Sequence, residues 1–377
     1  MTNHSVLQAK DKPPSYWPRK KKSWKIAVLA NIKDEHTERP ANVPPDAYAD
    51  YDHIETVRSI QGALETDGHK TEFIMADESL PFSLKKYNPD ICFNIAEGLG
   101  GDAREAQTPA LLEMLKIPYT ASRVLANAFA LDKNITKRIW RDRNLPVAPF
   151  QEFTIGNEPL RHELHFPLFV KPSREGTGMG VDIKAKVETE AELRERVEYV
   201  IQSYNQPALV ETYLPGREFT VGQIGRPDAA LSGRHPEWYA KDGFHRFPVL
   251  ELDSSKAATP GIYSHAAKSH LIGEEGAPEY ICPADIDPEL DKKLHHLAIR
   301  GHTILGALDV SRVDIRLDAE GQPRLIEINP LPGLTPGYSD LCLQAAAEGI
   351  TYEDLILEIL YLAAGRWNLL EPREGTH

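Results

Sequence analysis

The chain contains the stretch Arg312-Val313-Asp314-Ile315-Arg316, followed after a turn by Leu325-Ile326-Glu327-Ile328-Asn329-Pro330-Leu331-Pro332-Gly333. Apolar and polar residues alternate in both parts, which predicts two adjacent β-strands. Residues 320–323 read Glu-Gly-Gln-Pro and can turn the chain between the strands. Alternation therefore places Arg312, Asp314 and Arg316 on one face of the first strand. It places Glu327 and Asn329 on one face of the second.

Three of these side chains suit a metal ion: Asp314, Glu327 and Asn329. Two carboxylates and an amide supply the hard oxygen ligands that Mg²⁺ prefers when it bridges nucleotide phosphates, and Mn²⁺ could replace it. A solvated hairpin with a surface ion pair would show the same alternation. The remainder of the chain decides between these two interpretations.

The composition narrows the class of protein. The chain has 377 residues, of which 41% are hydrophobic, enough for a large core and two or three domains. Its net charge of -13 creates no field that would attract nucleic acid. The three cysteines are far apart and lack metal-ligand spacing, which favours reduced thiols in the cytoplasm. No apolar run reaches the roughly 18 residues of a membrane span. We therefore expect a cytoplasmic protein that binds small molecules, without a nucleic acid or membrane partner.

Alternating strands and helices follow a basic arm, residues 1–24, which we expect to be loosely ordered. Residues 25–30, 71–75 and 90–95 have the apolar pattern of strands, and residues 51–67 have that of a helix. This order predicts a parallel sheet, whose ligands gather at the carboxyl ends of the strands. Glu97 follows the third strand and is a candidate substrate contact, although a solvated loop acid would fit equally.

A second polar segment follows a strand that ends in Lys171. It reads Ser173-Arg174-Glu175-Gly176-Thr177-Gly178-Met179-Gly180. Its glycines allow backbone amides to approach a polyphosphate, to which Thr177 adds a hydroxyl and Lys171 a charge. No Gly-Lys-Ser/Thr opens a helix, so this is not the Walker pattern. Downstream, Glu211 and Glu218 flank a short linker whose backbone could hold a purine and its ribose.

Together these motifs resemble the ATP-grasp enzymes of the D-alanine:D-alanine ligase family over residues 25–367. The matching motifs, in family order, are Leu131-Asp132-Lys133 with Lys137, the glycine-rich segment, residues 210–221, residues 312–317 and residues 325–336. The resemblance implies an α/β chain with an ATP-grasp fold and an N-terminal Rossmann-like (pre-ATP-grasp) parallel-sheet domain. It divides the chain into the arm 1–24, the Rossmann-like domain 25–124, a central ATP-grasp subdomain 125–215 and a C-terminal ATP-grasp subdomain 216–377.

The resemblance also implies site residues and a homodimer. The residues expected to bind ATP are Lys133, Lys171, Glu211, Leu214, Glu218 and Lys268, the last in a mobile loop that we expect at residues 261–276. The expected magnesium ligands are Asp314, Glu327 and Asn329. The expected catalytic residues are Arg312, Lys268, Thr177 and Glu97. The residues expected to contact amino-acid or other carboxylate substrates are Glu97, Gly333 and Ser339.

The departures from the family pattern fall where amino acids would bind. The family's N-terminal glutamate loop is missing after residue 30, and its acid could be replaced by Asp50, Asp52 or Glu55. Glu97 stands in place of a histidine. Thr177 and Gly178 stand in place of two serines, and Ser269 in place of a tyrosine. These changes predict an altered amino-acid pocket.

The resemblance implies phosphoryl transfer from ATP to a carboxylate, followed by attack of an amine on the acyl phosphate. We therefore predict an ATP-dependent carboxylate-amine ligase with a divergent pocket. Two alternatives stay open: a true D-alanine–D-alanine ligase of cell-wall synthesis, and an ATP-grasp kinase or a non-catalytic nucleotide-binding protein.

Overall fold

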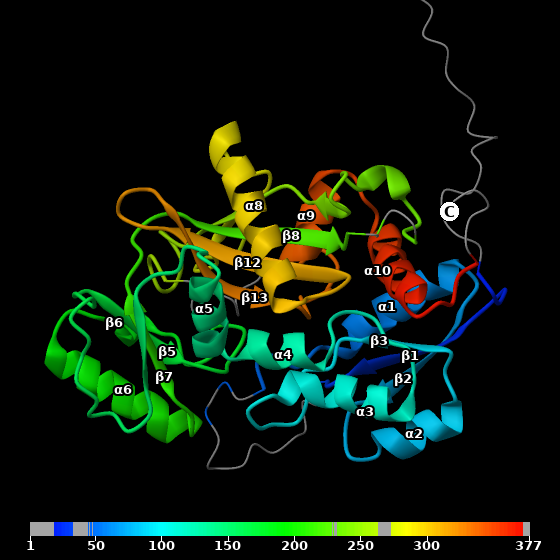
Figure 1. Ribbon diagram of the computed structural model, residues 1–377, viewed down its shortest axis with the longest axis horizontal. Helices are drawn as coiled ribbons and strands as arrows, with labels where there is room; N and C mark the ends of the chain where they lie inside the picture. The colour runs from blue at the N-terminus through cyan, green and yellow to red at the C-terminus, as the bar shows by residue number, and fades with distance from the viewer. Residues whose placement is uncertain are drawn as a thin grey trace, which may run out of the picture.

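Three β-sheets form the framework of the protein, and helices cover them (Figure 1). The computed structural model describes residues 19–32, 44, 46, 48–227, 229, 232–262 and 273–371. Most of the expected basic arm lies outside the described residues, as do Lys268, Ser269 and most of the expected loop 261–276. The predicted domain boundaries remain predictions.

The elements alternate along the chain. The strands are β1 (Lys25–Ala30), β2 (Lys70–Met75), β3 (Ile91–Asn94), β4 (Phe150–Phe153), β5 (Leu168–Pro172), β6 (Lys186–Val187), β7 (Ala208–Thr212), β8 (Glu218–Gly225), β9 (Phe244–Arg246), β10 (Leu250–Asp253), β11 (Glu279–Ile281), β12 (Val310–Leu317) and β13 (Pro323–Asn329). The helices are α1 (Ile54–Thr66), α2 (Leu80–Tyr87), α3 (Gln107–Leu115), α4 (Val124–Leu131), α5 (Lys133–Asp142), α6 (Glu190–Tyr204), α8 (Pro288–Leu305), α9 (Asp340–Ala347) and α10 (Tyr352–Arg366).

The N-terminal sheet is parallel, with the strand order β2-β1-β3, as the sequence predicts. All residues of β1 after Lys25 are buried, because helices cover both faces of a parallel sheet and leave no polar side. Helices α1 and α10 share a core cluster with β1 and β3 on one face. Glu97 lies just beyond the carboxyl end of β3, at the edge where such sheets bind ligands.

The second sheet has four strands in the order β4-β7-β5-β6, and α6 packs on it through Leu193, Val197 and Val200. Helix α6 begins with a capping box, in which Thr189 and Glu192 each accept a backbone N–H from the other. Strands β7 and β8 belong to different sheets, although only residues 213–217 separate them. The linker therefore spans the space between the two sheets.

The third sheet has the order β11-β10-β8-β12-β13, with β9 paired to β8. Helix α8 packs against it through a shared apolar cluster that includes Leu294, Leu297 and Ala298. The predicted hairpin is formed by β12 and β13, which pair antiparallel. Arg312 lies opposite Asn329, and Asp314 lies opposite Glu327, so the polar residues of the two strands face one another in register.

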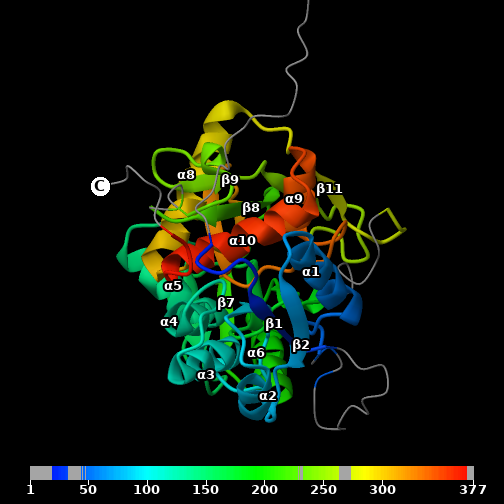
Figure 2. The ribbon, with the colours of Figure 1, turned by 90° about the vertical axis from the view of Figure 1, so that its right-hand side faces the viewer.

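The C-terminal helix α10 returns to the N-terminal sheet, as the turned view shows (Figure 2). Its residues Leu355 to Ala364 are all buried. The backbone oxygen of Tyr119, which forms a β-bridge with Cys92 of β3, accepts from Arg366, whose guanidinium also lies 2.7 Å from Asp309. Within the described ranges, no helix is long and apolar enough to cross a membrane.

Candidate active site

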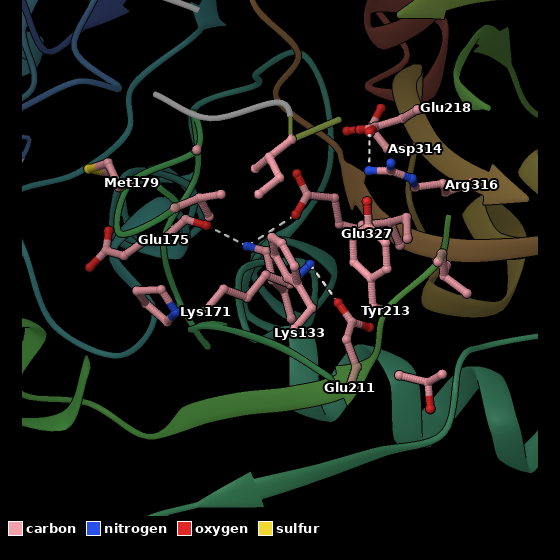
Figure 3. Close-up of a pocket in the computed structure, with 18 residues that line it drawn as sticks. Lys133, Lys171, Glu175, Met179, Glu211, Tyr213, Glu218, Asp314, Arg316 and Glu327 are labelled. Atoms are coloured by element: carbon pink, nitrogen blue, oxygen red, sulfur yellow. Dashed lines mark hydrogen bonds and ion pairs between the residues drawn. The ribbon is translucent and has the colours of Figure 1, made fainter. Parts of the chain in front are cut away.

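A pocket opens between the second and third sheets, and the residues predicted to bind ATP line it (Figure 3). Its predicted members are Lys133, Lys171, Glu211, Leu214, Glu218, Asp314 and Glu327. Strands β5 and β7 form one side of the pocket, and strands β12 and β13 form another side. The structure thus brings together residues that lie nearly two hundred positions apart in the sequence.

Glu211 is the electrostatic centre of this pocket. Its carboxylate lies 2.9 Å from the ammonium of Lys171 and 2.8 Å from that of Lys137. Burial alone would raise the pKa of Glu211, but the two lysines outweigh it and hold the pKa at about 2. Burial lowers the pKa of Lys137, whereas Glu211 and Glu327 outweigh burial at Lys171 and raise its pKa. Lys171 therefore stays charged in the pocket.

Lys133 is positioned by the start of α5. The side chain of Asp132 caps the helix by accepting from the backbone N–H of Ile135, so Lys133 occupies the first helical position. Its ammonium donates to the backbone oxygen of Glu175 in the glycine-rich segment and lies 3.3 Å from Glu327 (Figure 3). One cation thus contacts both the expected phosphate loop and an expected metal ligand.

The linker between β7 and β8 closes one end of the pocket. Leu214 is only 6% exposed and lines the pocket beside Tyr213. Glu218 pairs with Arg316 at 3.1 Å, and Arg316 also donates to the backbone oxygens of Gly216 and Gly261. The guanidinium of Arg316 therefore holds the linker and Glu218 together.

The hairpin residues fit a magnesium ion by the chemistry of their donors. Asp314 is 7% exposed, accepts from the Thr220 hydroxyl at 2.8 Å and lies across the ladder from Glu327. Asn329 donates to Asp314 at 3.5 Å, which brings its amide to the same place. In the described part of the chain no three His, Cys, Asp or Glu side chains are grouped to hold a metal ion. Mg²⁺ would thus need the Asn329 oxygen, water and phosphate oxygens to complete its six ligands.

A second cavity adjoins the first and contains the residues predicted to contact substrate. Glu97, Thr177, Gly333, Ser339, Arg312 and Asn329 all line it. The glycine-rich segment separates the two spaces, since Gly178 lines the nucleotide pocket and Thr177 lines the second cavity. Thr177 has φ of 49°, a left-handed conformation that a branched residue rarely adopts. Gly180 leaves no room for a side chain, because a Cβ would lie 2.5 Å from Pro172.

The far wall of the second cavity comes from the segment after β13. The Ser339 hydroxyl accepts from the backbone N–H of Thr335 at 3.0 Å, and a Cβ on Gly333 would lie 2.8 Å from that hydroxyl. Arg312 lies 2.5 Å from Asp340 and 3.1 Å from Asp314. Two carboxylates thus fix the guanidinium between the hairpin and the start of α9.

All predicted site residues in the described part of the chain line one of the two spaces, and their roles remain predictions. Sequence reasoning missed Arg104, Asp340 and Tyr213, and it assigned no role to Arg316. Arg316 could have been found, because it shares a strand face with Asp314. Arg104 and Asp340 carry no comparable signal, since their partners Asp50 and Arg312 are distant in the sequence. Of the three acids considered for the missing glutamate, Asp50 and Asp52 line the cavity, whereas Glu55 is 72% exposed.

Known proteins are similar to this chain in sequence and in fold. The family described as D-ala D-ala ligase C-terminus matches residues 139–361. A D-alanine–D-alanine ligase of Haemophilus influenzae is 31% identical over 312 residues, which cover 81% of this chain and 94% of that protein. The chain belongs to the D-alanine–D-alanine ligase family. A further relative, from Sinorhizobium fredii, is described as uncharacterized protein y4sG. It is 32% identical over 317 residues, which cover 82% of this chain and 87% of that protein.

The solved structures agree on the fold of this ligase family. The D-alanine–D-alanine ligase of Bacillus anthracis complexed with ATP superposes with a TM-score of 0.67 at 21% identity. The match covers 92% of this chain and 99% of that one. The α/β architecture, with a parallel N-terminal sheet and an ATP-grasp fold, is therefore confirmed.

Proposed function

We propose that this protein is an ATP-dependent ligase that joins a carboxylate to an amine through an acyl phosphate. The observation that carries the proposal is the junction of the two spaces at one hairpin. Asp314 and Glu327 line the nucleotide pocket, whereas the pair Arg312 and Asn329, two residues away along each strand, lines the second cavity. A carboxylate bound in the second cavity would therefore meet the terminal phosphate of a nucleotide in the first.

The side chains of the pocket suit each part of this reaction. Lys171 and Lys133 carry positive charge at the glycine-rich segment, where they would orient phosphates and offset their charge. Arg312 is held by Asp314 and Asp340 and would face the oxygens of the transferring phosphoryl group. Magnesium held by Asp314, Glu327 and Asn329 would neutralise charge on the phosphates. Glu218 would accept from the ribose hydroxyls, as the family likeness implies.

An oxygen-isotope experiment tests the acyl phosphate. The carboxylate oxygen attacks phosphorus, and the phosphate later leaves with that oxygen when the amine attacks the carbonyl carbon. If the acid substrate carries oxygen-18 in its carboxylate, the released phosphate should contain one labelled oxygen. Unlabelled phosphate accompanied by amide product would refute this route.

True D-alanine–D-alanine ligation is the second candidate, because several relatives carry that name, including a protein of Chromobacterium violaceum at 30% identity. Glu97, which lines the second cavity where the family has a histidine, argues against D-alanine as the preferred substrate, because the exchange changes the electrostatic character of the pocket. A homodimer and a cytoplasmic location belong to the same proposal and follow from the family likeness. Light scattering of the purified protein tests the dimer.

A further inference from the structure

The wall of the second cavity that faces away from the hairpin is acidic. Asp50, Asp52, Glu97 and Glu105 line it, and all four belong to the N-terminal third of the chain. The loop that carries Asp50 lies against the glycine-rich segment, since a Cβ on Gly176 would lie 3.0 Å from the Asp50 carboxylate. The acids therefore stand beside the place where the nucleotide pocket and the cavity meet.

Among the described residues, Arg104 is the cation that pairs with this wall. Arg104 lies 2.8 Å from Asp50, but the same guanidinium nitrogen lies 3.3 Å from Glu175, so its charge is shared. The other oxygen of Asp50 has no hydrogen-bond partner among the described residues, although the side chain is only 8% exposed. The side chains of Asp52, Glu97 and Glu105 form no hydrogen bond or ion pair with another described residue.

Three acids of this wall have pKa values above those of ordinary carboxyl groups. Burial raises the pKa of Asp52 to about 7, with a further contribution from Asp50. Burial, followed by the charges of Glu105 and Asp50, holds the pKa of Glu97 above its ordinary range. Burial also raises the pKa of Glu105 to about 7, although Arg104 opposes it. A cation in the cavity would favour the charged form of these groups and would lower their pKa values when it binds.

The arrangement of the acids selects the kind of cation. No three His, Cys, Asp or Glu side chains of the described chain are grouped to hold a metal ion, so these carboxylates do not converge on one point. They line a wall instead, and an extended molecule with amines at separate positions would contact several of them. The opposite side of the cavity, with Arg312 and the segment around Gly333, would receive a carboxylate.

We infer that the cavity binds a diamino carboxylic acid, whose second amine pairs with the acidic wall of Asp52, Glu97 and Glu105. This assignment rests on the proposed function, because it takes the second cavity as the substrate side of the ligase. It specifies the substrate class: a carboxylate that carries two ammonium groups rather than one. Asp50 and Arg104 would fix the edge of the wall against the glycine-rich segment.

Isothermal titration calorimetry tests the assignment on the full chain saturated with a non-hydrolysable ATP analogue and Mg²⁺. The probes are pairs that differ only in the second amine, lysine against norleucine and ornithine against norvaline, each in D and L forms. We expect the best diamino acid to bind at least about tenfold more tightly than its uncharged partner, a difference of about 1.4 kcal/mol. Equal binding within every pair would overturn the assignment.

Variants of the wall residues test whether the acidic wall causes the preference for a diamino acid. Glu97→Gln and Asp52→Asn should each reduce the ratio of the affinity for the diamino acid to the affinity for its uncharged partner. Glu55→Gln is the matched control, because Glu55 is a nearby acid of α1 that is 72% exposed and outside the cavity. A preference that survives in both cavity variants would contradict the assignment. Thermal unfolding of each variant shows whether it is folded, and the single-residue amide replacements change volume little.

Activity separates this assignment from the proposed function. If ATP-dependent amide products form from neutral amino acids as readily as from diamino acids, the substrate assignment is wrong and the proposed ligase activity is supported. If diamino acids bind preferentially but no pair of substrates releases ADP, the proposed ligase activity is wrong and the assignment of a diamino-acid binding site is supported.

Discussion

Lys133 and Glu327 form an ion pair of 3.3 Å across the nucleotide pocket. Lys133 is expected to contact phosphate, and Glu327 is expected to contact magnesium, so the pair joins the two halves of the nucleotide site. Without a ligand, each side chain neutralises the charge that the other would leave exposed. Binding of a magnesium nucleotide would give each of them a new partner of opposite charge.

The first prediction concerns the hairpin carboxylates. Glu327→Gln and Asp314→Asn should each reduce turnover by at least about 100-fold, because the lost charge acts on the metal and the transferring phosphate. Steady-state ADP release measures this, with circular dichroism to show that the fold is kept. Glu320→Gln is the control, since Glu320 is exposed in the turn of the same hairpin. Full activity in either hairpin variant would contradict the assignment of Asp314 and Glu327 as magnesium ligands.

The second prediction separates nucleotide from substrate binding. Lys171→Ala should weaken ATP far more than the amino-acid substrate, because its ammonium lies in the nucleotide pocket and outside the second cavity. Titration calorimetry with each ligand measures both affinities. Lys184→Ala, an exposed lysine of the same subdomain, should change neither. Equal weakening of ATP and substrate by Lys171→Ala would argue against a phosphate contact.

The local parts of this site could be predicted from the sequence. Alternation over residues 312–316 correctly placed Asp314 and Arg316 on one face, because side chains in a strand alternate between its two sides. Strand β1 has the predicted bounds, and the turn after β12 contains Gly321 with φ of 73°. These features depend only on neighbouring residues, so the sequence determines them.

The long-range parts could not be predicted. The ladder between β12 and β13 is irregular after Asp314, so that Ile326 as well as Glu327 lines the nucleotide pocket, and simple alternation does not foresee this. The sequence predicts a short linker between strand β7 and strand β8, but no local pattern shows that the two strands belong to different sheets. The ion pair of Arg104 with Asp50 depends on how two segments far apart in the sequence pack, which no local pattern predicts.

A third prediction concerns stability and pH. Glu358 of α10 is fully buried and accepts from the backbone N–H groups of Arg234 and His235 and from the Tyr239 hydroxyl. Burial raises the pKa of Glu358 from 4.5 to about 7. The folded state therefore holds this proton more tightly than the unfolded chain, and the stabilisation present below pH 4.5 is lost as the pH rises towards 7.

Glu358→Gln should remove this contribution. The free energy of unfolding of the unmodified protein should fall, relative to that of the variant, by up to about 3 kcal/mol between pH 4.5 and pH 8. Urea unfolding at several pH values measures it. Glu353→Gln changes an exposed acid of the same helix and should leave the pH dependence unaltered. Parallel curves for Glu358→Gln and the unmodified protein would show that this carboxyl does not titrate in the expected range.

The fourth prediction concerns D-alanine. Glu97 carries a carboxylate where the family has a histidine, and a buried polar mismatch typically costs about 1 to 3 kcal/mol. We expect the efficiency of D-alanyl-D-alanine formation to stay below about 10⁴ M⁻¹ s⁻¹, the lower end of ordinary enzyme performance. Coupled ADP assays with D-alanine measure it. A higher efficiency that Glu97→Ala leaves unchanged would make the protein an ordinary cell-wall ligase.

The most direct test of the central claim is the stoichiometry of ADP and amide. Purified protein with ATP and Mg²⁺ is incubated with pairs of D- and L-amino acids, diamino acids and simple acids, and products are identified by mass spectrometry. The ligase predicts that ADP accumulates in equal amount with a new amide and requires both a carboxylate and an amine substrate. Release of ADP with a stable phosphorylated product from a single substrate, or nucleotide binding without ADP for every pair, would contradict it.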